Sequence, residues 1–224
     1  MLPKQNGILP SHFHKIITKI FSNFKKGEAV LSGGCALTEY YLGHRKADDI
    51  DIFVSDHSII NTVCDCLERS FTLIAIDEQG PNSFVFNIRV GEHDVPVHCI
   101  YLSKIKSEIQ QKWTNHFEGV FLHDCAFIAA WKVNRPLNED NYDVLRDLVD
   151  LYYIISRSGD IPKIVEAFID IGRELIPYPY EISLPHDQNM LSKITTDIEL
   201  SDIDGFAKRF ESDFDKLYRL RLSC

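Results

Sequence analysis

The stretch LSGGCALTEYYLGHRKADDIDIFV, residues 31–54, decides the fold of this chain. It places the pair Gly33 and Gly34 after a short apolar run, and the pair Asp49 and Asp51 at the start of a second one. Side chains alternate along a strand, so two carboxylates that flank a single isoleucine project from the same side. Carboxylates so close together repel each other, and a divalent cation between them removes that repulsion.

The glycine pair supplies the complementary half of such a site. Backbone N–H groups without side chains, at the start of a helix, can hold a phosphate. Mg²⁺ is commonly bound by one or two carboxylates together with water and substrate phosphates. Either motif alone is also compatible with an ordinary turn or with solvated surface acids. Their order, with 14 residues between Gly34 and Asp49, favours nucleoside triphosphate chemistry with Mg²⁺ or Mn²⁺.

Composition limits the partners and the compartment. The 224 residues carry a formal net charge of −9, so contact with nucleic acid would need a local basic patch. The opening MLPKQNGILP lacks the features of a signal peptide, no run is long enough to span a membrane, and the six cysteines form no CxxC pair. We therefore expect a cytoplasmic chain with reduced thiols. One candidate basic path, more typical of a solvated face, consists of Lys104, Lys106, Lys112, Lys132 and Arg135.

The apolar periods predict an α/β (α+β) fold with a small mixed sheet, followed by a helical half. The chain divides near residues 105–123, and we place an α/β core at 1–120 and a helical domain at 121–224. The predicted helices of the core cover 13–24, with Ser11 as cap, 35–42 and 57–69; the predicted strands cover 29–31, 49–55, 71–76, 83–90 and 95–102.

The helical half contains two patterned segments and one irregular one. In the first segment, one face is expected to pack (Val144, Leu148, Leu151, Ile155) and another to be a charged surface (Asp143, Arg146, Asp147, Asp150). Ser201 and Asp204 resemble a capping box at the start of the last helix. The proline-rich stretch 176–185 is expected to be an irregular connection.

The motifs together resemble a known family. "GGCAL" followed by "LGHRKADDIDIF" is similar to the AbiEii/AbiGii toxin branch of the polymerase-β-like nucleotidyltransferases. The resemblance continues in "AFIAAWKVNR", which contains Lys132, and in "LRDLVDL", which contains Arg146, Asp147 and Asp150, so that it covers residues 28–155. It implies a polymerase-β-like core and a helical domain that completes the nucleotide site.

The resemblance also implies roles for individual residues. Asp49 and Asp51 would bind the metal, and catalysis would involve these two with Lys132 and Asp147. The nucleotide would be bound by Ser32, Gly33, Gly34, His44, Arg45, Lys132 and Asp150. Asp147 and Asp150 would organise Lys132 or position the acceptor. His44 and Arg45 would either hold the loop or touch phosphate.

The reaction implied is transfer of a nucleoside monophosphate from an NTP to an acceptor hydroxyl. In the toxin branch the acceptor would be RNA, such as tRNA, and a cognate antitoxin would be a further partner. Two other interpretations stay open. One is a nucleotidyltransferase acting on a small, aminoglycoside-type acceptor, which the acidic charge would suit. The other is a nucleotide-binding module whose catalytic site is degenerate.

Three positions depart from the family pattern. Cys35 stands in place of threonine and Ala47 in place of serine, and both changes leave backbone donors intact. The third carboxylate is expected about where His98 stands, and an imidazole is a softer ligand than Mg²⁺ prefers. Asp94 is the nearest acid on the same side of the predicted strand. Either Asp94 substitutes, or water or the ion takes the role of the base, or catalysis is lost while binding survives.

Overall fold

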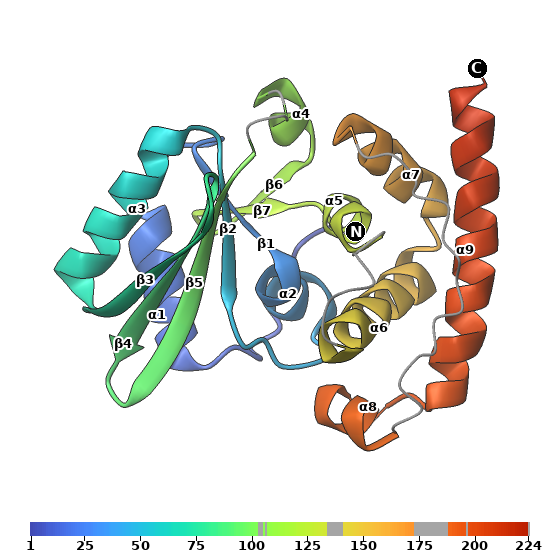
Figure 1. Cartoon of the computed structure of the whole chain (residues 1–224), viewed down its shortest axis with the longest axis horizontal. Helices are drawn as coiled ribbons and strands as arrows, with labels where there is room; N and C mark the ends of the chain where they lie inside the picture. The colour runs from blue at the N-terminus through green and yellow to red at the C-terminus, as the bar shows by residue number, and fades with distance from the viewer. Residues whose placement is uncertain (103–104, 106, 134–140, 173–187, 196, 224) are drawn as a thin grey trace. The chain divides into compact units, whose positions relative to one another are not determined.

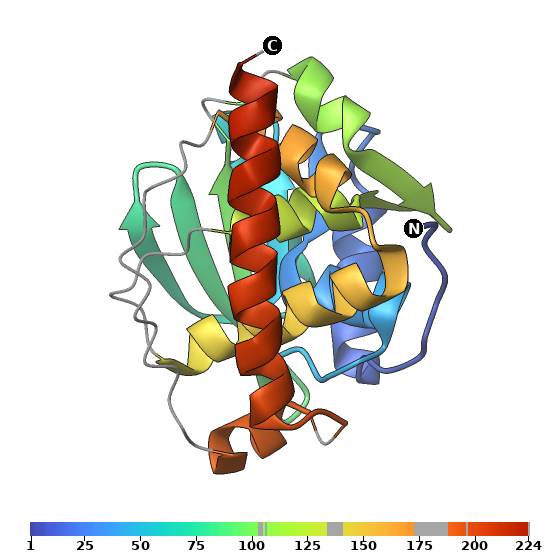
Figure 2. The ribbon, with the colours of Figure 1, turned by 90° about the vertical axis from the view of Figure 1, so that its right-hand side faces the viewer.

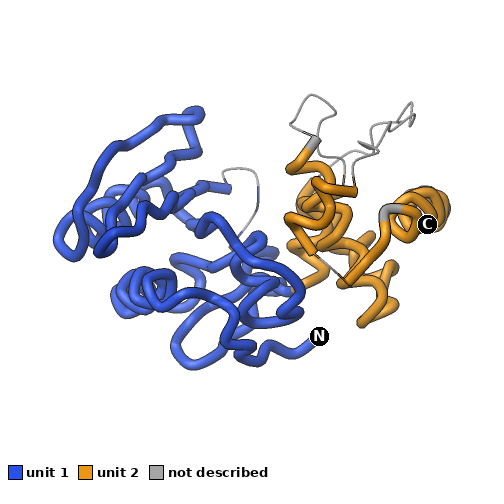
Figure 3. The backbone as a smooth tube through the Cα atoms, turned by 90° about the horizontal axis from the view of Figure 1, so that it is seen from below, with its two compact units in different colours: residues 1–124 blue, residues 125–224 orange. Residues whose placement is uncertain are grey.

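The computed structural model describes residues 1–102, 105, 107–133, 141–172, 188–195 and 197–223. These residues form two compact units, Met1–Asp124 and Cys125–Cys224 (Figure 3). The predicted fold class is confirmed, because a mixed sheet with helices is followed by a helical segment. The proline-rich stretch and three members of the candidate basic path (Lys104, Lys106, Arg135) lie outside the described residues.

The first unit is built on a seven-stranded sheet with the order β3-β4-β5-β2-β1-β7-β6 (Figure 1). The β2–β5 and β1–β7 pairs are parallel, and the other neighbours are antiparallel. The sheet is therefore mixed, as predicted. The strands are β1 Ala29–Ser32, β2 Ile50–Val54, β3 Thr72–Gly80, β4 Ser83–Val90, β5 His93–Tyr101, β6 Thr114–Phe117 and β7 Val120–His123.

Helices α1 (Ser11–Phe21) and α3 (His57–Ser70) lie together on one face of this sheet (Figure 1). Each has one apolar stripe; the stripe of α1 buries Phe13, Ile16, Ile17, Ile20 and Phe21. Asp56 caps α3 by accepting a hydrogen bond from the Ser58 backbone N–H at 2.7 Å. The expected cap of α1 was wrong, since Pro10 is the N-cap residue and Ser11 begins the helix.

The sheet also differs from the prediction in two places. The region 105–123, near which the chain was expected to divide, contains helix α4 (Ser107–Lys112) and the β6–β7 hairpin, and the first unit ends at Asp124. Strand β3 continues to Gly80, beyond residue 76 where the predicted strand ends, and Glu78 pairs with Phe84. Residues 77–80 and strand β6 are polar and β7 has only four residues, so these segments lack the extended apolar alternation that reveals a strand, and pairing with a neighbouring strand determines their structure.

The predicted helix at 35–42 is longer and irregular. It begins as α2 (Gly33–Ala36) and continues as the π-helix η1 (Leu37–Leu42). Within η1, Glu39 is fully buried and accepts hydrogen bonds from the backbone N–H groups of Gly7, Ile8 and Leu9 at 3.0, 2.8 and 2.9 Å. A buried carboxylate needs such donors, so Glu39 holds the N-terminal segment against η1.

The second unit consists of helices (Figure 2): α5 Cys125–Lys132, α6 Asn141–Ser158, α7 Ile161–Asp170, α8 Gln188–Ile194 and α9 Leu200–Leu222. Aromatic rings of α9 pack on α7, with the ring centroids of Phe168 and Phe214 5.3 Å apart. The capping box of α9 is formed by Glu199 and Asp202, two residues before the predicted pair. No helix among the described residues is both long and apolar enough to cross a bilayer.

The predicted faces of α6 need correction. Leu145, Val149 and Ile154 are buried together with the predicted Leu151, whereas the other three predicted packing residues are half-buried. Asp147 and Asp150, expected on a charged surface, are buried as well. Lys132 of α5 forms ion pairs with both carboxylates, and this charge compensation allows them to leave water.

The parallel β1–β7 pair contains a buried histidine. The His123 ring nitrogen Nδ1 lies 3.0 Å from the Ser32 hydroxyl, and the ring packs against Phe53. Burial lowers the pKa of His123 to about 3. The imidazole is therefore neutral in the folded protein throughout the neutral and mildly acidic range.

This pKa predicts an acid-sensitive fold. An unfolded histidine titrates near 6.5, so between about pH 6.5 and pH 3 the unfolded chain binds a proton that the folded chain does not, and stability falls as the pH falls. From pH 7 to pH 5, His123 should contribute a loss of about 2 kcal/mol in the free energy of unfolding. Urea unfolding is measured at both pH values. Between pH 7 and pH 5, the free energy of unfolding should fall by about 2 kcal/mol less in His123→Asn than in the unaltered protein. Equal losses in the two proteins would contradict the assignment.

Candidate functional site

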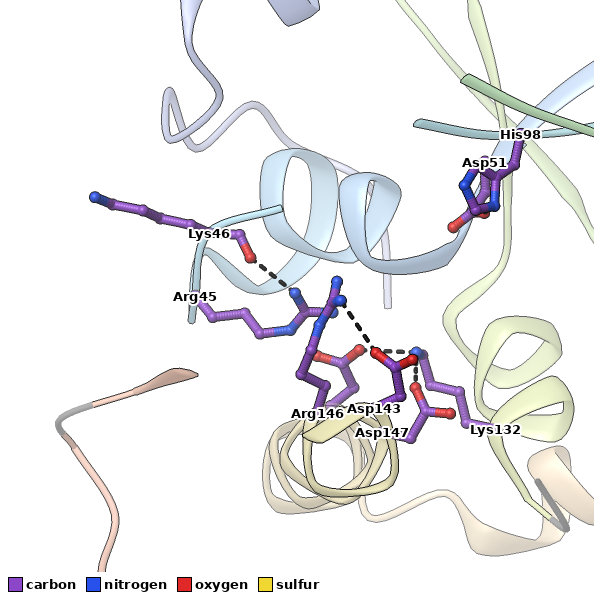
Figure 4. Close-up of polar contacts among 9 residues, drawn as sticks. Arg45, Lys46, Asp51, His98, Lys132, Asp143, Arg146 and Asp147 are labelled. Carbon is purple, nitrogen blue, oxygen red and sulfur yellow. Dashed lines mark hydrogen bonds and ion pairs between the residues drawn. The ribbon is translucent and has the colours of Figure 1, made fainter. Parts of the chain in front are cut away.

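The candidate site is a row of side chains across neighbouring strands. Ser32 pairs with Asp51 between β1 and β2, and Asp51 pairs with His98 between β2 and β5. Residues directly opposite in a sheet project from the same face. The His98 Nδ1 atom lies 3.6 Å from the nearer Asp51 carboxylate oxygen (Figure 4).

Asp49 completes the group from the position just before β2. One ligand atom from each of Asp49, Asp51 and His98 lies within 4.8 Å of the other two, and all three residues are half-buried. This is the one cluster of three or more histidine, cysteine or acidic residues with that spacing among the described residues. Two carboxylates and an imidazole fit a divalent cation, and the nitrogen ligand favours a transition metal such as Mn²⁺ over Mg²⁺.

The glycine pair is needed here for steric reasons. A Cβ atom on Gly33 would lie 1.7 Å from the Asp51 atom Oδ2, and the φ angle of Gly33 is +64°. A Cβ on Gly34 would lie 2.4 Å from Nη2 of Arg45. The turn therefore lies directly against the acidic group on one side and against a guanidinium on the other.

Two predicted residues near this turn are buried. Arg45 is buried, packs on Gly34 and donates from Nη1 to the Lys46 carbonyl at 2.7 Å, which fits the loop-holding role better than an exposed phosphate contact. His44, the residue before Arg45, is also buried. Burial and the nearby charges of Asp51 and Asp49 raise the pKa of Cys35 well above its usual value, so its thiol stays neutral.

Asp94 and His98, the two alternatives for the third ligand, differ in their surroundings. The Asp94 carboxylate forms a two-point ion pair with Arg89, with N–O distances of 2.6 and 2.9 Å, and this hydrogen bonding lowers its pKa. Asp94 is not part of the cluster of ligand atoms from Asp49, Asp51 and His98.

Ser32 belongs to the same row, and its hydroxyl contacts His123. Sequence reasoning missed His123, because β7 was not predicted.

The second unit contains the other predicted residues. Lys132 forms ion pairs with Asp147 and, at 2.9 Å, with Asp150; its side chain is 11% exposed, against 7% and 0% for the two acids (Figure 4). Also on α6, Arg146 lies 3.4 Å from the carboxylate of Asp143, one turn earlier, and over the Tyr142 ring. The ammonium group thus bridges α5 and α6 through two buried carboxylates.

Comparison with known proteins identifies relatives by fold. No protein-family model matches the sequence, and no curated protein does. Among solved structures, JHP933 from Helicobacter pylori is 14% identical, with a TM-score of 0.53 over 96% of this chain and 98% of that one. A candidate nucleotidyltransferase from H. pylori is 16% identical, with a TM-score of 0.53 over 92% and 96%. At these identities the likeness establishes a shared fold over nearly the whole length.

The close approach of Gly33 and Asp51 predicts a specific defect. Gly33→Ala should abolish Mn²⁺ binding in calorimetric titration, because the new methyl group must displace the Asp51 carboxylate. Gly91→Ala is a matched control, since Gly91 has a φ of +65° and a Cβ added there would meet nothing within 4 Å. Both variants should lose about 1–2 kcal/mol of stability to backbone strain. Unchanged Mn²⁺ affinity in Gly33→Ala would show that Asp51 is not a ligand.

The Lys132 cluster predicts a large loss of stability. Lys132→Met removes the cation that pairs with two buried carboxylates, which should cost about 3–5 kcal/mol in the free energy of unfolding measured with urea. Adding Asp147→Asn and Asp150→Asn removes the uncompensated charge and should restore much of the loss. The exposed Lys208 on α9 provides the control, since Lys208→Met should change stability by less than about 0.5 kcal/mol. An unchanged free energy of unfolding in Lys132→Met would contradict the ion-pair account.

Proposed function

We propose that this chain is a divalent-metal-dependent nucleotidyltransferase of the AbiEii/AbiGii toxin type. It transfers a nucleoside monophosphate from an NTP to a hydroxyl group of an RNA acceptor such as tRNA, and a cognate antitoxin is its expected protein partner. The observation that carries the proposal is the convergence of Asp49, Asp51 and His98 beside the Gly33 turn. The fold shared with a candidate nucleotidyltransferase supports it.

In this proposal the residues of the acidic group hold the cation. Asp49 and Asp51 supply oxygen ligands and negative charge, and His98 supplies a nitrogen ligand. A bound divalent cation supplies neutralisation of phosphate charge and activation of the acceptor hydroxyl. The backbone at Gly33 and Gly34 lies against this group without intervening side chains, so we assign to it the binding of the triphosphate.

The remaining predicted residues have supporting roles. Ser32 holds the row in register through His123, and Arg45 supports the glycine turn. Asp147 and Asp150 orient Lys132 by ion pairs, which agrees with the organising role that the family resemblance implies. Phosphate contact by Lys132 and a catalytic role of Asp147 remain part of the proposal.

His98 favours one alternative function. A nucleotidyltransferase of this type is expected to have a carboxylate at that position, and an imidazole there supplies no negative charge to the cation site. A degenerate module would bind NTP without transferring it. The two possibilities differ in whether pyrophosphate is released.

Metal preference tests the proposal. The unaltered protein should bind NTP in the presence of Mn²⁺ more tightly than in the presence of Mg²⁺, and Asp49→Asn/Asp51→Asn should lose metal-dependent binding in calorimetric titration. Asp94→Asn, outside the acidic group, should retain it. His98→Asp should shift the preference toward Mg²⁺, because an oxygen ligand replaces nitrogen. Metal-independent NTP binding that survives the double change would contradict the proposed site.

Activity is measured with α-labelled NTPs, unfractionated tRNA and an aminoglycoside in parallel. Label on tRNA with release of pyrophosphate is the expected result. Label on the aminoglycoside and not on tRNA would show that the acceptor is a small molecule. NTP binding without any transfer, combined with transfer by His98→Asp, would favour the degenerate module.

A further inference from the structure

A basic depression lies on the first unit, outside the row of the candidate site. It has a volume of about 650 Å³ and is formed by one side of α1 and the C-terminal end of α3. Its cations are Lys15, Lys19 and Arg69, and His14, Thr18, Ser22 and Ser70 complete its polar lining. Among the described residues, no aspartate or glutamate lines it.

The charge of this surface contrasts with that of the whole chain. Residues 1–27 contain five lysines and no aspartate or glutamate, although the chain as a whole carries 33 acidic residues against 24 Lys and Arg. Lys15 and Lys19 lie one turn apart on α1, and both are exposed. An acidic protein that binds RNA needs such a local concentration of positive charge.

Contacts between α1 and α3 fix the shape of the depression. The last turn of α1 meets α3 at Cys66, whose Sγ atom lies 3.5 Å from the Lys19 carbonyl and 3.4 Å from Nδ2 of Asn23. The two helices lie side by side on the sheet (Figure 1). The cations are thus carried by regular helices packed on a core, which fixes their spacing.

Helix electrostatics explain only part of this arrangement. Lys19 and Arg69 lie in the last turns of their helices, where positive charge is favourable without any ligand. Arg69 also contacts Asp65 at 3.7 Å, but with side chains 80% and 60% exposed this pair is weak. Neither effect accounts for Lys15 or for the absence of acids before residue 28.

We propose that this depression, the α1–α3 groove, binds the phosphodiester backbone of the RNA acceptor. The inference rests on the proposed function for the presence of an RNA acceptor. Lysine, arginine and hydroxyl side chains are the groups that contact phosphate and sugar without reading sequence. The half-buried Phe71 is the one large apolar side chain in the described lining, so the groove offers little to anchor a lipid surface.

The test compares two charge reversals of equal size. Lys15→Glu/Lys19→Glu alters the groove, and Lys208→Glu/Lys216→Glu alters two exposed lysines of α9. Binding of fluorescent unfractionated tRNA is measured by anisotropy from about 50 to 200 mM salt. NTP binding is titrated in parallel on the same proteins, because it reports on the Asp49 and Asp51 site independently of the groove.

The groove variant should bind tRNA about tenfold more weakly or worse, and the slope of log affinity against log salt should fall by about 2. The α9 variant should lose less than about threefold, and NTP binding should be unchanged in both variants. Equal tRNA affinity in the two variants would overturn the proposal. So would binding to phosphatidylserine vesicles that depends on Lys15 and Lys19, with no binding of tRNA. Failure of all proteins to bind tRNA, with NTP binding intact, would overturn the groove but not nucleotidyl transfer.

Discussion

The contact between the Gly33 backbone and the Asp51 carboxylate is the constraint on which the candidate site depends. The carboxylate occupies the space of a side chain that Gly33 does not have, and the positive φ of Gly33 turns the chain from β1 into α2 at that point. An acid can therefore lie directly against a backbone turn. The same approach would bring a phosphate and a metal ligand together, which is why the two motifs are informative only as a pair.

The sheet extends this contact into a row. Antiparallel pairing sets Ser32 beside Asp51, and parallel pairing sets Asp51 beside His98. Register, and not sequence distance, thus determines which groups share the site. The buried His123 continues the row beyond Ser32, where its neutral ring accommodates burial without adding charge. The cost of this arrangement is that burial opposes protonation of His123, so that acid destabilises the fold.

Local patterns predicted much of this structure. The glycine pair, the Asp49 and Asp51 pair and the stripe of α1 follow from residues close in the chain. The family pattern placed the third ligand about at His98 and left Asp94 as an alternative, and the structure brings His98 together with Asp49 and Asp51. Strands β6 and β7 escaped prediction because they are short and become strands through their pairing with each other and with β1.

The faces of α6 were misjudged for a related reason. Helical periodicity assigns Asp147 and Asp150 to water, whereas their ion pairs with Lys132 on α5 favour their burial. Similarly, the sequence could not show that Arg89 takes Asp94 into an exposed ion pair and leaves His98 as the neighbour of Asp51. Ion pairs between segments distant in sequence are invisible to periodicity.

The most direct measurement is anomalous diffraction at the manganese absorption edge, from crystals of the protein grown with Mn²⁺ and a non-hydrolysable NTP. The account predicts an anomalous peak bounded by the side chains of Asp49, Asp51 and His98, with the triphosphate against Gly33 and Gly34. A bound NTP with no manganese at these three residues would contradict it.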